Sequence, residues 1–198
     1  MEQQTLVFLG PQGGGKGTQV TLLEQYLRRE DVSRQTVVLS VGKMLRDFSA
    51  REGYTAQRVR DSLARGEMQP GFISGYLTAQ YLLEQSQGTE HLIFDGYPRS
   101  AENFYNFDSA MSFYKRPYPT LLYVRISDDA AVERLLKRGR SDDTPEGIRK
   151  RLGWAHEQEA FSIDHFKNNP QYRFFEINGE QPIEAVHNDI LAVLGLTQ

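Results

Sequence analysis

The chain has 198 residues, of which 39% are hydrophobic and 25% charged, as is typical of one soluble globular domain with a sizeable core. The formal net charge of −3 provides no overall basic field that would favour nucleic acid or an acidic membrane surface as a partner. The absence of cysteine excludes disulfide bonds and thiolate metal sites. No apolar stretch has the length of a membrane span or the pattern of a signal peptide, so we expect a cytoplasmic protein.

The first predicted elements are a buried strand at residues 5–9 and a helix over residues 19–29. Between them lies Gly10-Pro11-Gln12-Gly13-Gly14-Gly15-Lys16-Gly17-Thr18. Glycines let backbone N–H groups turn toward an anion, the helix start adds partial positive charge, and Lys16 adds a full one. This order predicts a phosphate-binding loop. A flexible loop would not require Lys16 and Thr18 at its exit, and a dinucleotide-binding motif would need a third glycine in place of Thr18.

The remaining chain alternates between predicted strands and helices. We expect strands at residues 36–40, 91–94, 120–126 and 173–177, and helices at 42–51, 57–65, 73–85, 101–113, 130–137, 145–168 and 183–194. Ser100, Ser127 and Thr144 are the expected N-caps. Five strands separated by helices predict an α/β fold with a parallel sheet covered on both faces, in a strand order that the sequence does not give.

Ligands of such sheets bind beyond the carboxyl ends of the strands, so the loops after residues 9, 40 and 94 are expected to meet in one cleft. Asp95, which ends an apolar strand, is the candidate to hold Mg²⁺, directly or through water; the alternative is a turn aspartate. Arg99 follows four residues later and can face the same cleft. A further set of arginines can close over a polyphosphate as a lid, or else form a solvated charged face: Arg134, Arg138, Arg140 and Arg151.

Four blocks of sequence resemble the adenylate kinase family of nucleoside monophosphate kinases: residues 10–19, 40–46 (SVGKMLR), 95–103 (DGYPRSAEN) and 133–152 (ERLLKRGRSDDTPEGIRKRL). The resemblance implies one P-loop NTPase-type kinase domain over residues 1–198. It also implies a mobile acceptor-binding flap at about residues 40–69 and a short lid at about residues 137–143, without the zinc site of longer lids. The implied reaction is reversible transfer of the ATP γ-phosphoryl group to a nucleoside monophosphate, with AMP as first choice, by a Mg²⁺-dependent monomer.

The same resemblance implies roles for individual residues. The ATP site is expected to comprise Gly13, Gly14, Gly15, Lys16, Gly17, Thr18, Arg134, Arg138 and Gln181. The monophosphate site is expected to comprise Val41, Arg46, Glu67, Met68, Gln69, Gly96, Tyr97, Pro98, Arg99, Asn103, Arg140 and Arg151. The catalytic set is expected to be Lys16, Arg99, Arg138, Arg140 and Arg151, because phosphoryl transfer to an ionised phosphate needs alignment and cations rather than a general base.

Departures from the family pattern cluster where the acceptor base would bind. Val41 stands where a threonine is usual, Asn103 where a glutamine is usual, and Gln69 where an apolar residue is usual. Lys43 replaces an aspartate near the metal's water shell. Because asparagine at position 103 is more like the uridylate/cytidylate kinases, a UMP/CMP kinase is the alternative. A nucleotide-sensing module without turnover is an alternative of another class, against which the retained lysine and arginines count. A kinase that acts on another small metabolite is a further alternative. It would leave the segments DGYPR (residues 95–99) and RGRSDD (residues 138–143) unexplained.

Overall fold

The computed structural model of the chain describes residues 1–139 and 144–197. Within them, five parallel strands form one sheet in the order β2-β3-β1-β4-β5. The strands are β1 (Thr5–Leu9), β2 (Thr36–Ser40), β3 (His91–Asp95), β4 (Thr120–Arg125) and β5 (Arg173–Asn178). The helices are α1 (Lys16–Glu30), α2 (Val41–Ser49), α3 (Tyr54–Ala64), α4 (Gly71–Gln85), α5 (Ala101–Phe113), α6 (Asp128–Arg138), α7 (Pro145–Asn168) and α8 (Ile183–Val193). Each expected element is confirmed, with its ends shifted by at most about three residues, the usual uncertainty of helix and strand ends.

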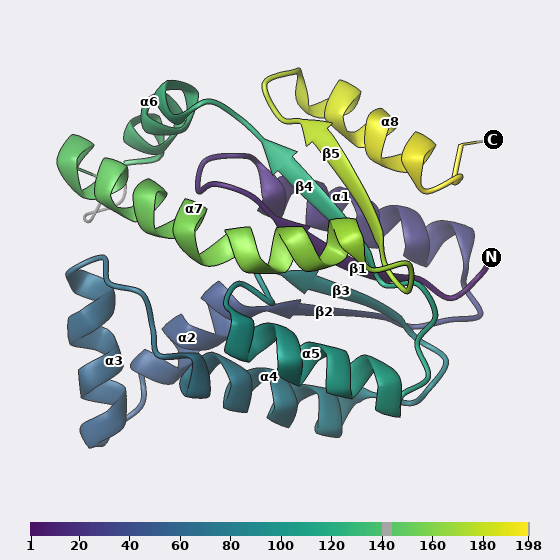
Figure 1. Ribbon diagram of the computed structural model, residues 1–198, viewed down its shortest axis with the longest axis horizontal. Helices are drawn as coiled ribbons and strands as arrows, with labels where there is room; N and C mark the ends of the chain where they lie inside the picture. The colour runs from purple at the N-terminus through teal and green to yellow at the C-terminus, as the bar shows by residue number, and fades with distance from the viewer. Residues whose placement is uncertain (140–143, 198) are drawn as a thin grey trace.

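Helices cover both faces of the sheet, as predicted (Figure 1). Side chains of β1 alternate between two cores: Leu6 and Phe8 pack with apolar residues of α1 and α8, whereas Val7 and Leu9 pack with those of α4, α5 and α7. Successive side chains of a strand point to opposite faces, so a central strand that is covered twice must be apolar throughout. The unbroken run at residues 5–9 follows from this arrangement.

The three predicted N-caps are present. The hydroxyls of Ser100, Ser127 and Thr144 accept hydrogen bonds from backbone N–H groups in the first turns of α5, α6 and α7. A cap of this kind satisfies a donor that has no partner within its own helix. The beginnings of these helices were therefore predictable from local residues alone.

The strand order brings the predicted loops to one edge of the sheet. Phe8 of β1 and Ser40 of β2 both stand opposite Asp95 of β3 in the strand pairing. The loops that follow β1, β2 and β3 consequently leave the same carboxyl edge side by side. The expected convergence is confirmed, and β1, whose loop carries the glycines, is the central strand of the sheet.

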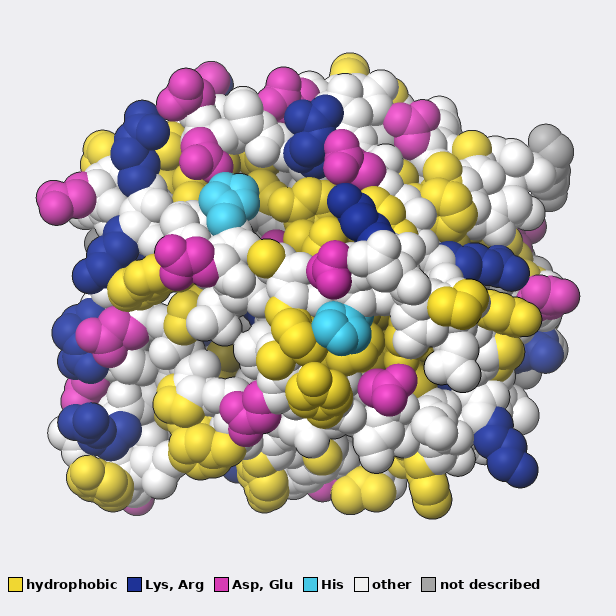
Figure 2. Space-filling model, viewed as in Figure 1, with side chains coloured by type: hydrophobic (Ala, Val, Ile, Leu, Met, Phe, Trp, Pro, Cys, Tyr) yellow, Lys and Arg dark blue, Asp and Glu magenta, His cyan; other side chains and the backbone are white. Residues whose placement is uncertain are grey.

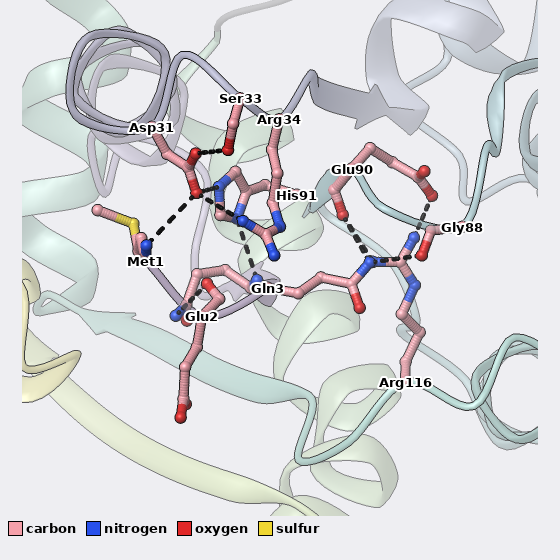
Figure 3. Close-up of polar contacts among 11 residues, drawn as sticks. Met1, Glu2, Gln3, Asp31, Ser33, Arg34, Gly88, Glu90, His91 and Arg116 are labelled. Atoms are coloured by element: carbon pink, nitrogen blue, oxygen red, sulfur yellow. Dashed lines mark hydrogen bonds and ion pairs between the residues drawn. The ribbon is translucent and has the colours of Figure 1, made fainter.

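Buried polar groups contact one another at the opposite edge of the sheet, where the strands begin (Figure 3). Arg116 donates to the Glu90 backbone oxygen at 2.6 Å and pairs with the Glu90 carboxylate, whose Oε2 accepts backbone N–H groups of Gln87 and Thr89. His91 Nδ1 accepts the Gln4 N–H at 3.0 Å. These contacts lie at the beginnings of the strands and join distant parts of the chain, and we assign them to stability of the fold.

Acidic, basic and hydrophobic side chains are intermingled on the molecular face that α5 and α7 share (Figure 2). In the part of the chain that the structure describes, no helix combines the length and the apolar character needed to cross a membrane.

Candidate active site

The glycine-rich loop joins β1 to α1 and has a backbone that side chains would obstruct. Gly10 has φ +129°, and a Cβ there would lie 2.2 Å from the Val124 backbone oxygen of β4. Gly15, with φ +82°, occupies the N-cap position of α1, which receives no side-chain capping hydrogen bond. The first N–H groups of α1 therefore have no side-chain cap and face the loop, as in an anion-binding site.

Lys16 is buried at the first position of α1, and its ammonium group turns back into the loop. It donates hydrogen bonds to the backbone oxygens of Gly10 at 2.6 Å and Pro11 at 2.8 Å. These two carbonyls hold a cation at the centre of the loop, beside the helix start. A phosphate group at this position would meet N–H donors and the ammonium together.

The same burial lowers the pKa of Lys16 to about 8, from its ordinary value of 10.5. Burial in low dielectric is the largest cause, and the positive charge of Arg99 is the next. The carboxylates of Glu159 and Asp95 act in the opposite direction. Arg99, Glu159 and Asp95 therefore all act electrostatically on Lys16.

Asp95 and Arg99 lie on the segment after β3. Ser40 Oγ donates to Asp95 Oδ2 at 2.9 Å, which joins the ends of β2 and β3. Arg99 Nε donates to the Gly96 backbone oxygen at 3.0 Å, and the Arg99 Nη1 atom lies 3.3 Å from Glu159 Oε1. Gly96 has φ +78°, and a Cβ there would approach Arg99 Nη2 to 3.0 Å, so glycine gives the guanidinium room to fold back. Tyr97 and Pro98, which are joined by a cis peptide bond, are buried between these groups.

Arg151 of α7 connects the phosphate loop with the segment between α3 and α4. Its Nε donates to Gln12 Oε1 at 3.2 Å. Its side chain also passes Gly66, where a Cβ would lie 3.4 Å from Arg151 Cδ. Arg151, which is expected in the monophosphate site and the catalytic set, thus lies between the phosphate loop and the segment that holds residues 67–69.

Glu159, two turns beyond Arg151 on the same buried face of α7, is a site residue that the sequence motifs did not indicate. Its side chain is 3% exposed, and it contributes to the raised pKa of Tyr123, for which burial is the larger cause. Residues 151, 155 and 159 are spaced four apart on a helix, and this periodicity is the signal that could have placed Glu159 near the arginines.

On the other side of the loop, Arg134 of α6 reaches the connection between β5 and α8. Arg134 Nη1 donates to the Gly179 backbone oxygen at 2.8 Å. Gln181 follows on this connection and donates through Nε2 to Asp189 Oδ2 at 2.7 Å. The structure thus brings the Arg134 side chain to the segment that carries Gln181.

Arg138 ends α6, and its positive charge also lowers the pKa of Lys16. Arg140 and the other residues of the expected lid from 140 to 143 lie outside the described residues. Of the expected lid, only residues 137–139 are among the described residues.

Other residues expected around the monophosphate lie on α2, on the segment between α3 and α4, and at the start of α5. Val41 is buried at the start of α2, and the exposed Arg46 has its Nη1 atom 3.4 Å from the position of a Cβ on Gly42. Asn103 is buried, and its Nδ2 donates to the Gly71 backbone oxygen and to Ser74 Oγ, both at 3.2 Å. Its amide nitrogen therefore contacts α4.

The segment at residues 67–69 is held by local contacts. Glu67 pairs with Arg65 at 2.8 Å, which lowers the pKa of Glu67, and Gln69 Nε2 donates to Ser62 Oγ at 2.6 Å. Lys43 pairs with Asp47 at 2.6 Å on the surface of α2. Its side chain, 71% exposed, thus makes its ion pair within its own helix.

A hollow of about 570 Å³ separates this segment from α7, and it is lined by Glu67, Met68, Lys150, Trp154, Glu157 and Gln158. Trp154, the only tryptophan, has the Lys150 ammonium 4.8 Å from its ring centroid. Trp154, Glu157 and Gln158 lie beyond the sequence blocks that carry the family resemblance. A larger hollow of about 850 Å³ lies at the opposite edge of the sheet, against Arg34, Tyr118 and Arg173, away from the phosphate loop.

The fit of a metal ion can be judged from the oxygen ligands. Among the described residues, no group of three or more histidine, aspartate or glutamate side chains is placed to enclose a metal. Mg²⁺ usually binds through one or two carboxylates with substrate phosphates and water. Asp95, at the strand end beside the phosphate loop, fits that mode of binding.

The four histidines lie away from this site, as expected for structural or surface residues. His91 is buried at the start of β3, His156 contacts Asp128 at 3.0 Å, and the rings of His165 and His187 lie beside Phe161 and Tyr26. None of them is placed to act as a base in the cleft.

Comparison with known proteins identifies similar chains. The sequence model described as adenylate kinase matches residues 8–171. Adenylate kinase 1 of Nostoc sp. is 33% identical over 193 residues, covering 96% of this chain and 98% of the relative. An adenylate kinase of Prochlorococcus marinus is 30% identical over 186 residues, covering 93% and 95%. One from Thermus thermophilus is 30% identical over 197 residues, covering 98% of both.

Proposed function

The chain belongs to the adenylate kinase family and phosphorylates AMP with ATP, and we propose the following roles for its residues in that reaction. It is a nucleoside monophosphate kinase, and the UMP/CMP alternative is not favoured, since the matched relatives are named adenylate kinases. The departures at Val41, Gln69 and Asn103 are therefore interpreted as variation within an AMP site.

The donor ATP binds at the phosphate loop. The N–H groups of residues 13–18 and the Lys16 ammonium hold its phosphates, with Thr18 beside them. Arg134 and Gln181 flank the adenine, a role supported by the hydrogen bond from Arg134 to the segment that carries Gln181. Arg138 stands at the end of the same helix, where it can reach the phosphates.

The acceptor AMP binds on the β2–β3 side of the cleft. Arg46 and Arg99 hold its phosphate, while Arg151 lies between donor and acceptor phosphates. Arg140 joins this set as an expectation from the family pattern. The base and sugar are placed against the remaining residues of the expected site: Val41, Glu67, Met68, Gln69, Gly96, Tyr97, Pro98 and Asn103.

The transfer itself requires positioning and charge. The AMP phosphate oxygen is already ionised, so it needs alignment with the ATP γ-phosphorus and cations around the three oxygens that carry the developing charge. Lys16, Arg99, Arg138 and Arg151 supply those cations. Mg²⁺, which the family uses, would neutralise charge on the β- and γ-phosphate oxygens, and Asp95 would hold it through water.

We further propose that residues 40–69 form a flap on the single kinase domain and residues 137–143 a short lid. α2 and α3 share a small core of their own with α4, which includes Val59, Ile73 and Leu77. Figure 1 shows α3 at the edge of the molecule, beyond the sheet. The Arg151 side chain passes Gly66 near the end of this flap. A movement of the flap would therefore act directly on a residue that we assign to phosphate binding. We expect a cytoplasmic monomer.

The observation that carries these roles is the convergence of Asp95, Arg99 and Glu159 on Lys16 at one sheet edge, where the charges of all three influence the pKa of Lys16. Two variants test the separation of donor and acceptor sites. Arg99→Ala removes a charge-assisted contact to the AMP phosphate and should raise the KM for AMP by about tenfold or more, with little change for ATP. Arg134→Ala should raise the KM for ATP instead.

Arg28→Ala is the matched control, because Arg28 is an exposed arginine of α1 that pairs with Glu24. It should leave both KM values unchanged. If Arg99→Ala and Arg134→Ala raised both KM values equally, the assignment of separate sites would be wrong.

A further inference from the structure

The site contains a buried acid that the roles above do not use. Glu159 is 2% exposed in the middle of α7, and its Oε1 atom lies 3.3 Å from Arg99 Nη1. That oxygen is buried and accepts no hydrogen bond. An isolated carboxylate is costly to bury, so its neighbours must explain its presence.

A comparison within the chain shows how unusual this carboxylate is. Glu90, the other buried glutamate, accepts two backbone N–H groups and pairs with Arg116, so its oxygens are satisfied by fixed structure. Glu159 has an ion pair at 3.3 Å and a buried oxygen without a hydrogen bond. Glu90 has the environment of a structural residue, whereas Glu159 is placed among groups expected to bind a ligand.

Glu159 is not needed to orient Arg99. The Arg99 guanidinium is held by its own Nε hydrogen bond to the Gly96 oxygen at 3.0 Å, and its Nη2 atom lies 3.0 Å from the position that a Cβ on Gly96 would take. The ion pair with Glu159 adds electrostatic attraction, but the orientation of the Arg99 guanidinium does not depend on it. Removing that charge while keeping the shape should therefore leave Arg99 in place.

The charges around Glu159 indicate what it balances. Lys16, Arg99 and Arg138 bring positive charge toward this part of the cleft, and Asp95 and Glu159 bring negative charge. The charge of Glu159 also acts on Tyr123 of β4, whose pKa is raised by burial first and by Glu159 second. Among the described residues, Glu159 is the buried acidic side chain that forms an ion pair with Arg99.

We propose that Glu159 is a built-in counter-anion: it neutralises the phosphate-binding cations while the site is empty and opposes the incoming phosphate of the acceptor. The inference rests on the proposed function in one respect, the role of Arg99 on the acceptor phosphate. Its consequence is that Glu159 holds the affinity for the monophosphate down, which favours release.

Glu159→Gln tests this proposal, since it removes the charge and keeps the shape. By calorimetry, AMP should bind the variant about tenfold more tightly, because a unit negative charge within one side-chain length of the bound dianion is gone. Inorganic phosphate should raise the melting temperature of the variant more than that of the unaltered chain. Asp164→Asn is the matched control: it removes the same charge from the exposed side of α7 and should behave as the unaltered chain.

Unchanged or weaker AMP binding by Glu159→Gln would overturn the proposal. So would a melting temperature that falls equally with and without phosphate, which is the behaviour of a purely structural ion pair. The unaltered protein offers a test that does not depend on folding of the variant. Its Glu159 carboxyl carbon resonance, observed by NMR, should shift as inorganic phosphate is titrated in, and an unmoved resonance would contradict the proposal.

These tests are separable from the proposed function. ADP formation from ATP and AMP by the unaltered protein decides the function. The phosphate titrations require no turnover and decide the role of Glu159.

Discussion

The position of Lys16 leads to a prediction in which stability and activity change in opposite directions. A pKa of about 8, against an ordinary 10.5, means that the buried ammonium disfavours the folded state by about 3 kcal/mol relative to a neutral amine. Lys16→Met removes that charge, but it also leaves the Gly10 and Pro11 carbonyls without their donor, a loss of about 1–2 kcal/mol. The empty variant should therefore be more stable at pH 7 by about 1–2 kcal/mol, or roughly 2–8 °C in melting temperature for a chain of this length.

The effect of pH follows from the sign of the shift. The pKa of Lys16 is lower in the folded state than in the unfolded one, so the destabilising contribution is fully present below pH 8. It is lost as the pH rises from about 8 to 10.5. The stability difference between Lys16→Met and the unaltered chain should accordingly decrease in this window.

The variant should at the same time lose kcat by roughly a hundred- to a thousandfold, as expected when a preorganised cation is removed from a transferring phosphoryl group. Calorimetric melting without nucleotide at pH 7 and pH 10, together with a coupled assay of ADP formation, measures both effects. Lys43→Met is the control for stability, because Lys43 is exposed and should change stability by less than about 0.5 kcal/mol. A Lys16→Met protein that is less stable than the unaltered chain at pH 7, or that retains its kcat, would refute the reasoning.

Two further predictions concern the fold that supports the site. Arg116→Met leaves the Glu90 carboxylate buried without its cation, so it should lower the free energy of unfolding in urea by about 3–5 kcal/mol. The kcat at 20 °C should stay unchanged. A loss of stability below about 1 kcal/mol would contradict the assignment of this pair to the stability of the fold. Gly10→Ala should lower the free energy of unfolding by about 3 kcal/mol or more, because its Cβ would lie 2.2 Å from the Val124 oxygen at φ +129°. Gly17→Ala, where a Cβ meets no atom within 4 Å, should retain the stability of the unaltered chain, and an equal loss in both variants would argue against the close approach.

The elements that could be predicted from the sequence are those with local causes. The β1 strand is apolar throughout because both of its faces are covered, and Ser100, Ser127 and Thr144 mark helix starts through hydrogen bonds within four residues. The glycine loop was recognisable because Gly10 and Gly15 need backbone conformations that other residues rarely adopt.

The features that could not be predicted depend on contacts between distant parts of the chain. The strand order β2-β3-β1-β4-β5 has no local signal. Glu159 belongs to the site because it pairs with Arg99, which lies 60 positions away in the sequence. Trp154 likewise lines a hollow together with Met68, from a distant segment. Lys43, which replaces an aspartate of the family pattern, pairs with Asp47 because an i,i+4 partner of opposite charge is available on its own helix.

The measurement that tests the account most directly is phosphate transfer from Mg-ATP to AMP, UMP, CMP and dTMP in parallel, compared by kcat/KM. We expect a clear preference for AMP, with Val41, Gln69 and Asn103 as tolerated variants of the AMP site. A preference for UMP or CMP would contradict it and would make those three positions the determinants of specificity.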